Sequence, residues 1–112
     1  MDDEIRYGFL LRLYRGEEKF FGPGVARLLS LVEQKGSLRM AALDMGMAYS
    51  KAWRIIKETE AALDIQLLNR DGAHGSTLTP EGNTLLDTYL DIDKKMQVEA
   101  IKVYQKILSK SK

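Results

Sequence analysis

The sequence lacks cysteine, and this absence excludes disulfide frameworks, thiolate metal sites and cysteine nucleophiles. It has one histidine, and a lone histidine without cysteines or clustered carboxylates nearby does not make a metal site. No apolar run approaches the ~18 residues that a membrane-spanning helix needs, and the acidic residues 1–4 are unlike the basic start of a signal peptide. We therefore expect a cytoplasmic protein with no membrane segment and no metal.

The motifs of the common enzyme classes are also missing. The chain has no Gly-rich phosphate loop, no nucleophile elbow and no metal-binding motif. Its closely spaced acids, Glu58 with Glu60 and Asp91 with Asp93, are two residues apart. At that spacing they point to different faces of a helix and do not form a shared acid–base site. We expect neither enzymatic activity nor a cofactor.

What the sequence does contain is the composition of one soluble globular domain: 112 residues, 45% hydrophobic and 29% charged. The formal net charge is only +1, but the charges are segregated along the chain. Residues 39–57 carry +3 and residues 94–112 carry +5, whereas residues 79–93 carry −4. The two basic blocks, rather than the net charge, bear on the choice of partner.

Apolar periodicity and turn residues predict a mainly α fold with two small β-hairpins. A first helix ends at Gly36, and Ser37 is placed to cap the next helix. Thr79 and Pro80 open the last helix with a capping hydroxyl and a proline at the first helical position. The predicted single domain comprises an N-terminal hairpin over 5–21, a three-helix core over 24–63 with helices at 24–35, 38–45 and 50–63, a wing over 65–78 and a long helix over 80–109.

The N-terminal hairpin and the long last helix indicate that the protein associates with a second copy of itself. The hairpin has an alternating apolar face and two phenylalanines to pack with it, namely Tyr7, Phe9, Leu11, Leu13, Phe20 and Phe21. The long helix repeats apolar residues with an 11-residue period, at Leu85, Tyr89, Ile92, Met96, Ala100, Val103 and Ile107. Roughly 30 residues make a helix ~45 Å long, more than one small domain covers. We expect a homodimer through residues 80–109 and the hairpin.

The helix expected over 50–63 has two different sides. Its apolar side consists of Ala52, Ile56, Thr59 and Leu63. Its basic side consists of Lys51, Arg54 and Lys57. A DNA major groove admits one α-helix that shows cations and hydrogen-bonding groups outward while its apolar side anchors it. With the helices before it and the hairpin after it, this organisation is typical of a winged helix-turn-helix. The alternative interpretation of the three cations is a solvated helix face.

Several runs, taken in order, resemble a known family. They are GSLRMAA at 36–42, MGMAYSKAWRIIKETE at 45–60, LLNR at 67–70 and LTPEG at 78–82. Together they resemble the N-terminal DNA-binding domain of the molybdate-responsive ModE regulators, and they are similar to the helix-turn-helix of LysR-type regulators. The resemblance covers about residues 19–90. It implies a winged helix dimerised through its long helix, with Ser50, Lys51 and Arg54 on the recognition helix and residues 70–76 in the wing.

Three departures limit what the resemblance implies. The molybdate-binding domains of ModE regulators have no counterpart in these 112 residues, so molybdate sensing is not carried over from the resemblance. The wing turn, residues 71–75, is short and contains an acid, where family members often have a longer Gly-rich wing. Ala48 stands where serine commonly caps the recognition helix, a loss of ~1 kcal/mol that leaves this helix to fray or to be capped by Ser50.

The residues expected to contact DNA lie on the second and third core helices and on the wing. They are Arg39, Tyr49, Ser50, Lys51, Trp53, Arg54, Lys57, Arg70, His74 and Ser76. Two of them have an equally physical alternative: Trp53 packs between helices, and Tyr49 closes the turn against the helix over 38–45. The lysines of residues 94–112 are either an accessory DNA contact or a solvated face that keeps a dimer soluble.

These features predict a homodimeric, sequence-specific DNA-binding transcriptional regulator. The helix over 50–63 would enter the major groove of a palindromic site. Any effector would be sensed at the dimer interface or by a separate effector-binding protein. The competing hypothesis is a winged-helix protein-interaction module that has lost DNA binding, which the acid in the wing and the modest net charge favour and the basic helix side opposes.

Overall fold

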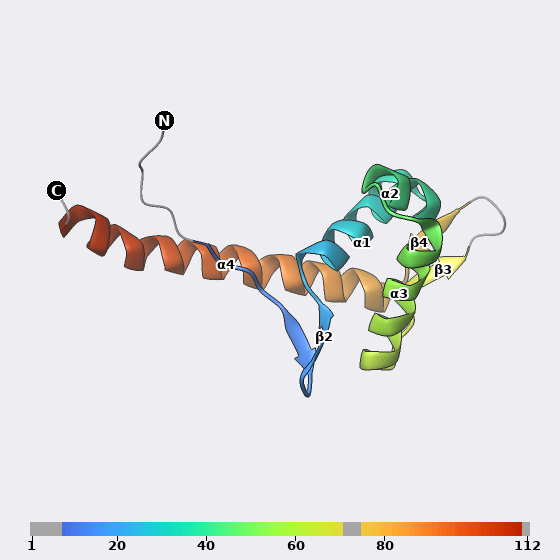
Figure 1. The fold of residues 1–112 in the computed structure, drawn as a ribbon, viewed down its shortest axis with the longest axis horizontal. Helices are drawn as coiled ribbons and strands as arrows, with labels where there is room; N and C mark the ends of the chain where they lie inside the picture. Colours follow the sequence, from blue (N-terminus) through green and yellow to red (C-terminus); the bar gives the residue numbers. More distant parts are fainter. Residues whose placement is uncertain (1–7, 71–74, 111–112) are drawn as a thin grey trace.

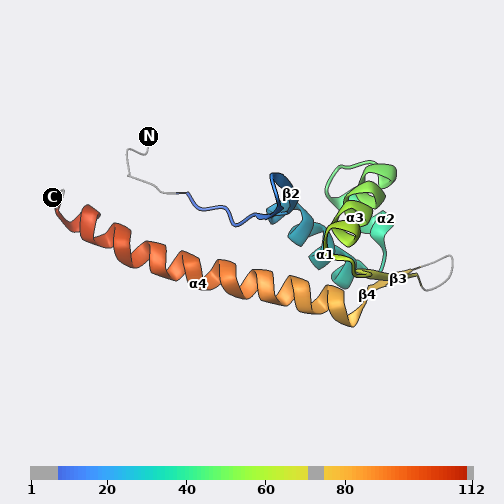
Figure 2. The same cartoon turned by 90° about the horizontal axis from the view of Figure 1, so that it is seen from below.

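The computed structural model describes residues 8–70 and 75–110 (Figures 1 and 2). Their elements are, in order, β1 (Leu13–Arg15), β2 (Glu18–Phe21), α1 (Pro23–Lys35), α2 (Leu38–Asp44), α3 (Tyr49–Leu63), β3 (Leu68–Arg70), β4 (Ser76–Leu78) and α4 (Pro80–Lys110). The strands form two antiparallel hairpins, β1–β2 and β3–β4. The predicted fold class, mainly helical with small hairpins and a long last helix, is confirmed. None of these described helices is long and apolar enough to cross a membrane.

Local residues set the junction between the first two helices. Gly36 has a φ of 70°, a left-handed conformation that favours glycine, and its N–H donates to the Val32 carbonyl at 2.7 Å. The Ser37 hydroxyl then accepts the N–H of Met40 at 3.2 Å, which satisfies one of the free donors at the start of α2. Both caps confirm the signals in the sequence.

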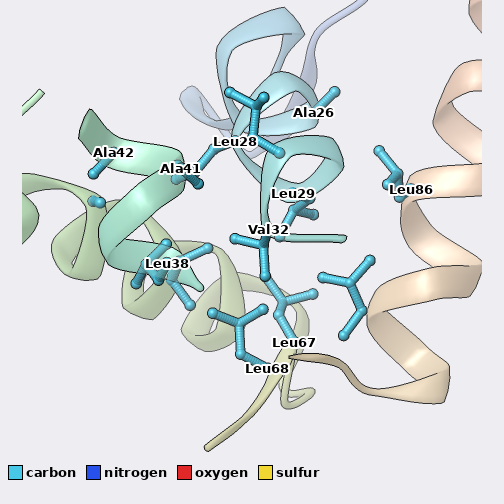
Figure 3. Packing of buried hydrophobic residues seen from close by; sticks show 14 of the residues in the cluster. Ala26, Leu28, Leu29, Val32, Leu38, Ala41, Ala42, Leu67, Leu68 and Leu86 are labelled. Carbon is cyan, nitrogen blue, oxygen red and sulfur yellow. The ribbon is translucent and has the colours of Figure 1, made fainter. Parts of the chain in front are cut away.

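The hydrophobic core surrounds α1. Figure 3 shows Leu28, Leu29 and Val32 of α1 pointing toward α2, the wing hairpin and α4. The buried apolar residues are Phe21, Ala26, Leu28, Leu29, Leu31, Val32, Leu38, Ala41, Ala42, Ala52, Ile56, Leu67, Leu68, Leu78, Leu86 and Tyr89. All four helices and both hairpins contribute to one cluster, so the start of α3 is anchored to a single packed body.

The joint between the wing and α4 is tight. The Thr79 N–H donates to the Leu67 carbonyl at 2.9 Å, and the Thr79 hydroxyl accepts the Gly82 N–H at 2.9 Å. A Cβ on Gly82 would lie 2.4 Å from the Leu67 oxygen, so the helix approaches the wing more closely than any side chain allows. Thr79 is therefore the cap of α4 that the sequence predicts. Its hydrogen bond to Leu67, together with the absence of a side chain at Gly82, holds the start of α4 against the chain just before β3.

The N-terminal hairpin is shorter than the predicted range of 5–21, since residues 8–12 of that range are not part of a strand. β1 begins only at Leu13, because β2 is four residues long and ends where Gly22 precedes α1. Residues 8–12 have no strand to pair with and instead follow α4 (Figures 1 and 2). The Tyr89 hydroxyl donates to the Leu11 carbonyl at 2.6 Å, and Gln97 Nε2 donates to the Phe9 carbonyl at 3.3 Å. The predicted Tyr7 lies outside the described residues.

Only the first half of α4 is covered by the core. Leu86 and Tyr89 are buried, whereas Leu85, the first residue of the 11-residue period, is only partly buried. Figure 2 shows the second half extending beyond the other helices, and the molecule measures 59 × 34 × 23 Å. The exposed large apolar residues on that half are Met96, Val98, Ile101, Val103, Tyr104 and Ile107.

Candidate functional site

The third helix is fixed to the core through a short turn. α2 ends at Asp44, Gly46 has a φ of 65°, and the Met47 N–H returns to the Ala42 carbonyl at 2.9 Å. α3 follows with Ala48 as its cap residue, which supplies no side-chain hydrogen bond, as the sequence predicts. Its inward residues Ala52, Ile56 and Thr59 are almost fully buried, so the opposite side of the helix faces outward.

The outward side of α3 is basic. Ser50, Lys51, Arg54 and Lys57 are all exposed. Arg54 Nε lies 3.6 Å from a Glu58 carboxylate oxygen, and Lys57 Nζ lies 3.3 Å from a Glu60 oxygen. Lys51 forms no ion pair with any residue of the described part of the chain. Exposed ion pairs on one helix contribute only ~0.3–0.5 kcal/mol, so both paired cations can exchange their carboxylate for an outside anion.

Two aromatic rings lie between two cations in a row that runs from α2 to α3. The Arg39 guanidinium lies 4.1 Å from the centre of the Tyr49 ring, whose centre is 6.3 Å from that of Trp53. The Lys57 ammonium lies 5.4 Å from the Trp53 ring centre. Tyr49 and Trp53 are both half-buried against the core. Tyr49 therefore contacts α2 through Arg39, in keeping with one of its two interpretations, and Trp53 packs against the core while its ring also contacts Lys57.

The wing residues occupy different environments. The backbone of Arg70 lies in β3 and pairs with Ser76 of β4. Ser76 is only 7% exposed, and its N–H donates to the Gly36 carbonyl at 2.9 Å. Its expected role as a DNA contact is therefore wrong for the side chain, because β4 turns that face toward α1. The predicted His74 lies outside the described residues.

Glu58 and Glu60, which the sequence analysis considered only as a possible acid–base pair, form ion pairs with cations of the site. Glu60 is half-buried, and its carboxylate accepts the Leu67 N–H at 2.7 Å while it pairs with Lys57. Glu58 stands one turn after Arg54. The spacings of three and four residues on one helix predict both ion pairs, but the contact with Leu67 depends on how the chain returns after α3.

A metal site would be one other kind of chemistry for the described residues. In the ranges 8–70 and 75–110, no three histidine, aspartate or glutamate side chains gather closely enough to hold a metal ion. The exposed part of the candidate site thus consists of Arg39, Tyr49, Ser50, Lys51, Trp53, Arg54 and Lys57. It presents positive charge and hydrogen-bond donors from α3 and from the start of α2.

Comparisons with known proteins place this geometry in context. The model of the family described as bacterial regulatory helix-turn-helix protein, lysR family, matches residues 25–83. A search of curated proteins found no match. The CbnR DBD in its DNA complex has a TM-score of 0.59 at 22% identity, over 70% of this chain and 90% of that one.

Two structures of the BenM DBD are similar to the same extent. In the complex with catB site 1 DNA, the TM-score is 0.58 at 24% identity, over 73% of this chain and 90% of that one. In the complex with benA site 1 DNA, it is 0.59 at 26% identity, over 77% and 94%. These likenesses show that the present chain shares its fold with the matched DNA-binding domains.

Proposed function

Because this chain belongs to the LysR family of bacterial regulatory helix-turn-helix proteins, we propose that it binds double-stranded DNA sequence-specifically and regulates transcription. The observation that supports this most directly is the outer side of α3. It exposes Ser50, Lys51, Arg54 and Lys57 while Ala52 and Ile56 on the opposite side are completely buried. Such a helix fits a major groove and leaves its anchor in the core.

The roles of the side chains follow from their positions on α3. Ser50 and Arg54 lie on the turns that would face base edges, and an arginine reads guanine through two hydrogen bonds. Lys51 and Lys57 would bind phosphates, as would Arg39 at the edge of α2. The Tyr49 ring contacts Arg39 and the Trp53 ring contacts Lys57, and the exposed parts of both rings would face the DNA backbone. On the wing, Arg70 and His74 stay proposed phosphate contacts.

The regulator is proposed to act as a homodimer. The apolar residues on the second half of α4 are exposed in the single chain, and a second copy would cover them. Residues 8–12 run beside the same helix and would add to the interface. A two-fold axis would place two α3 helices on half-sites ~34–36 Å apart and would make the site palindromic.

Within the family, the motifs at 36–60 and 67–82 support a relationship to the N-terminal domain of ModE-type regulators. The proposal does not extend to a molybdate response. A regulator that acts on bacterial DNA works in the cytoplasm, which is the compartment that we propose. We assign it no enzymatic activity.

The test is selection of duplex oligonucleotides from a random pool, followed by sequencing, at two salt concentrations. The double variant Lys51→Glu/Arg54→Glu is the loss-of-binding control, and Lys95→Glu/Lys102→Glu on α4 is a matched control with the same charge change. Enrichment of a palindrome by the parent and by the α4 variant, but not by the α3 variant, supports the proposal. Equal retention of DNA by all three proteins contradicts it.

A protein-interaction module is the second candidate, and one observation favours it. Two of the three cations on α3 already have an acid on their own helix, Arg54 with Glu58 and Lys57 with Glu60. If no duplex is enriched at either salt concentration, this candidate replaces the first. Replacing both acids by glutamine separates the two functions, because it would strengthen DNA binding by releasing the cations.

A further inference from the structure

A cleft of about 520 Å³ opens between the β1–β2 hairpin, the start of α1 and one side of α3. This volume is in the range of small-molecule sites, which are ~300–1,000 Å³. Its apolar lining comes from three elements, with Phe20 on the hairpin, Val25 on α1 and Ile55 on α3. The hairpin wall lies outside residues 25–83, the part of the chain that matches the family.

The charges around this cleft are mostly of one sign. Arg12, Lys19 and Lys51 line it from three different segments. Its one acid, Glu58, lies 3.6 Å from Arg54 and is partly neutralised there. The start of α1 adds to the positive potential, because its cap residue Gly22 gives no side-chain bond and its first turn contains no acid. An apolar interior with a cationic rim is complementary to an amphipathic anion.

We propose that this cleft binds a small organic anion with an apolar body, such as a carboxylate on an aromatic or branched hydrocarbon. Its body would contact Phe20, Val25 and Ile55, and its carboxylate would meet Lys19, Arg12 and Lys51. Binding of this anion weakens DNA binding. This second statement rests on the proposed function, whereas the first does not.

Lys51 provides the coupling because it belongs to both surfaces. It lines the cleft and it lies on the outer side of α3. One ammonium cannot neutralise a carboxylate in the cleft and a DNA phosphate at full strength simultaneously. Loss of one phosphate contact per chain reduces the salt slope by ~1 and lowers affinity about fivefold to tenfold at moderate salt.

The hairpin provides a second route to the same helix. The Thr59 hydroxyl of α3 donates to the Phe20 carbonyl at 2.9 Å, and Arg15 Nη1 donates to the Ala62 carbonyl near the end of α3. A ligand that moves the hairpin would therefore also move α3, since one hydrogen bond from each strand of the hairpin joins it to that helix.

The first experiment measures binding without DNA, using the full chain labelled with ¹⁵N. The probe is 2-naphthoate, and its uncharged analogue 2-naphthamide has nearly the same shape. We expect 2-naphthoate, titrated to millimolar concentration, to shift the amide signals of Phe20, Gly24 and Lys51, with 2-naphthamide about tenfold weaker. Shifts confined to the second half of α4, no shifts at all, or equal affinity for the two compounds would overturn the anion site.

Variants locate the anion. Lys19→Gln removes a cation of the cleft that plays no part in the proposed DNA contacts, and Lys102→Gln removes one on α4. We expect Lys19→Gln to weaken 2-naphthoate about tenfold and Lys102→Gln to leave its affinity unchanged. The same spectra show that each variant is folded. Equal affinity of both variants for 2-naphthoate contradicts the assignment.

The second experiment measures the affinity for the selected duplex with and without saturating 2-naphthoate. A fivefold to tenfold loss in the parent, absent in Lys19→Gln, supports the coupling. Unchanged DNA affinity while the cleft is filled overturns it. If no duplex is bound under any condition, the proposed function has failed, and the spectra with 2-naphthoate still decide on the cleft.

Discussion

The Thr59 hydroxyl in α3 lies 2.9 Å from the carbonyl oxygen of Phe20 in β2 and donates a hydrogen bond to it. Thr59 is 1% exposed, and the same hydroxyl lies 3.1 Å from the Ile55 carbonyl of its own helix. The helix that bears the candidate site is thus joined to the N-terminal hairpin by a buried bond, in a place where water cannot substitute for the donor.

Replacing Thr59 by valine tests this bond. The shape of the side chain is kept while the donor is lost, and the Phe20 carbonyl is left without its partner. We expect a decrease of ~1–2 kcal/mol in the free energy of unfolding, measured by urea denaturation at one protein concentration. Thr88→Val on the exposed side of α4 is the matched control. We expect its free energy of unfolding to lie within ~0.5 kcal/mol of that of the parent. Equal stability of the two variants would contradict the role of the bond.

Gly82→Ala tests the close approach of α4 to the wing. Its Cβ would lie 2.4 Å from the Leu67 oxygen, and backbone atoms cannot yield as a flexible side chain would. We expect a loss of ~1–3 kcal/mol in the free energy of unfolding. Gly24→Ala is the control, because a Cβ there meets no atom within 4 Å. This variant should gain ~0.4–1 kcal/mol in the free energy of unfolding. If Gly82→Ala is as stable as Gly24→Ala, the close approach does not exist in solution.

Stability at high pH depends on Tyr89. Burial raises the pKa of its hydroxyl above the ordinary 10.0, the charge of Asp93 raises it further, and Arg12 opposes both. The unfolded chain therefore loses this proton first, so the stabilisation is complete below pH 10 and is lost as pH rises through the pKa of the folded state.

The corresponding variant is Tyr89→Phe. It loses the bond to the Leu11 carbonyl, so we expect ~1 kcal/mol lower stability at neutral pH and a smaller decline in stability above pH 10. Urea denaturation over a series of pH values measures both effects. Tyr14→Phe, at an exposed tyrosine, serves as the control and should decline as the parent does. A parent-like decline in Tyr89→Phe would refute the linkage.

The apolar surface on the second half of α4 predicts the oligomeric state. Met96 and Val103 are both about half exposed and are separated by two helical turns. We expect the parent to sediment as a dimer at micromolar concentration and Met96→Lys/Val103→Lys to sediment as a monomer. Thr84→Lys/Thr88→Lys adds the same charge to the first half of α4 and should stay dimeric. A monomeric parent would exclude the proposed homodimer.

Arg54 and Lys57 are expected to differ in their contribution to DNA binding. Arg54→Ala should relax the sequence preference if its guanidinium reads a base, at ~1–3 kcal/mol for the preferred duplex. Lys57→Ala should weaken all duplexes alike and reduce the salt slope by ~1, as for a phosphate contact. Competition binding with the selected and a scrambled duplex separates the two. Identical effects on both duplexes would reject this division of roles.

What the sequence predicts well is what neighbouring residues decide. The cap at Ser37, the left-handed end at Gly36 and the opening of α4 at Thr79 depend on a few consecutive residues, and all three are confirmed. The buried side of α3 follows from periodicity alone, so Ala52 and Ile56 lie where expected.

The rest depends on contacts between distant segments. Residues 8–12 alternate like a strand, but only the donors Tyr89 and Gln97 on α4 determine where their carbonyls bind. Leu86 is buried in place of Leu85 because the wing fixes the rotation of α4 about its axis, and periodicity does not specify that rotation. The inward placement of Ser76 also depends on a distant contact, because the register of β4 against β3 decides which face of the strand is inward.

The length of α4 has a mechanical consequence. Its 31 residues span ~46 Å; the core holds its first part through Leu86 and Tyr89, and beyond them Gln97 contacts Phe9 near the middle of the helix. A rod held in this way acts as a lever, so a tilt of about 5° at its base moves the opposite end by ~4 Å. A small change of angle at the joint of Thr79 and Gly82 would thus displace Val103 and Ile107 by several ångströms. The converse also holds, because force applied to that far end acts on the joint with the full length of the helix as its arm.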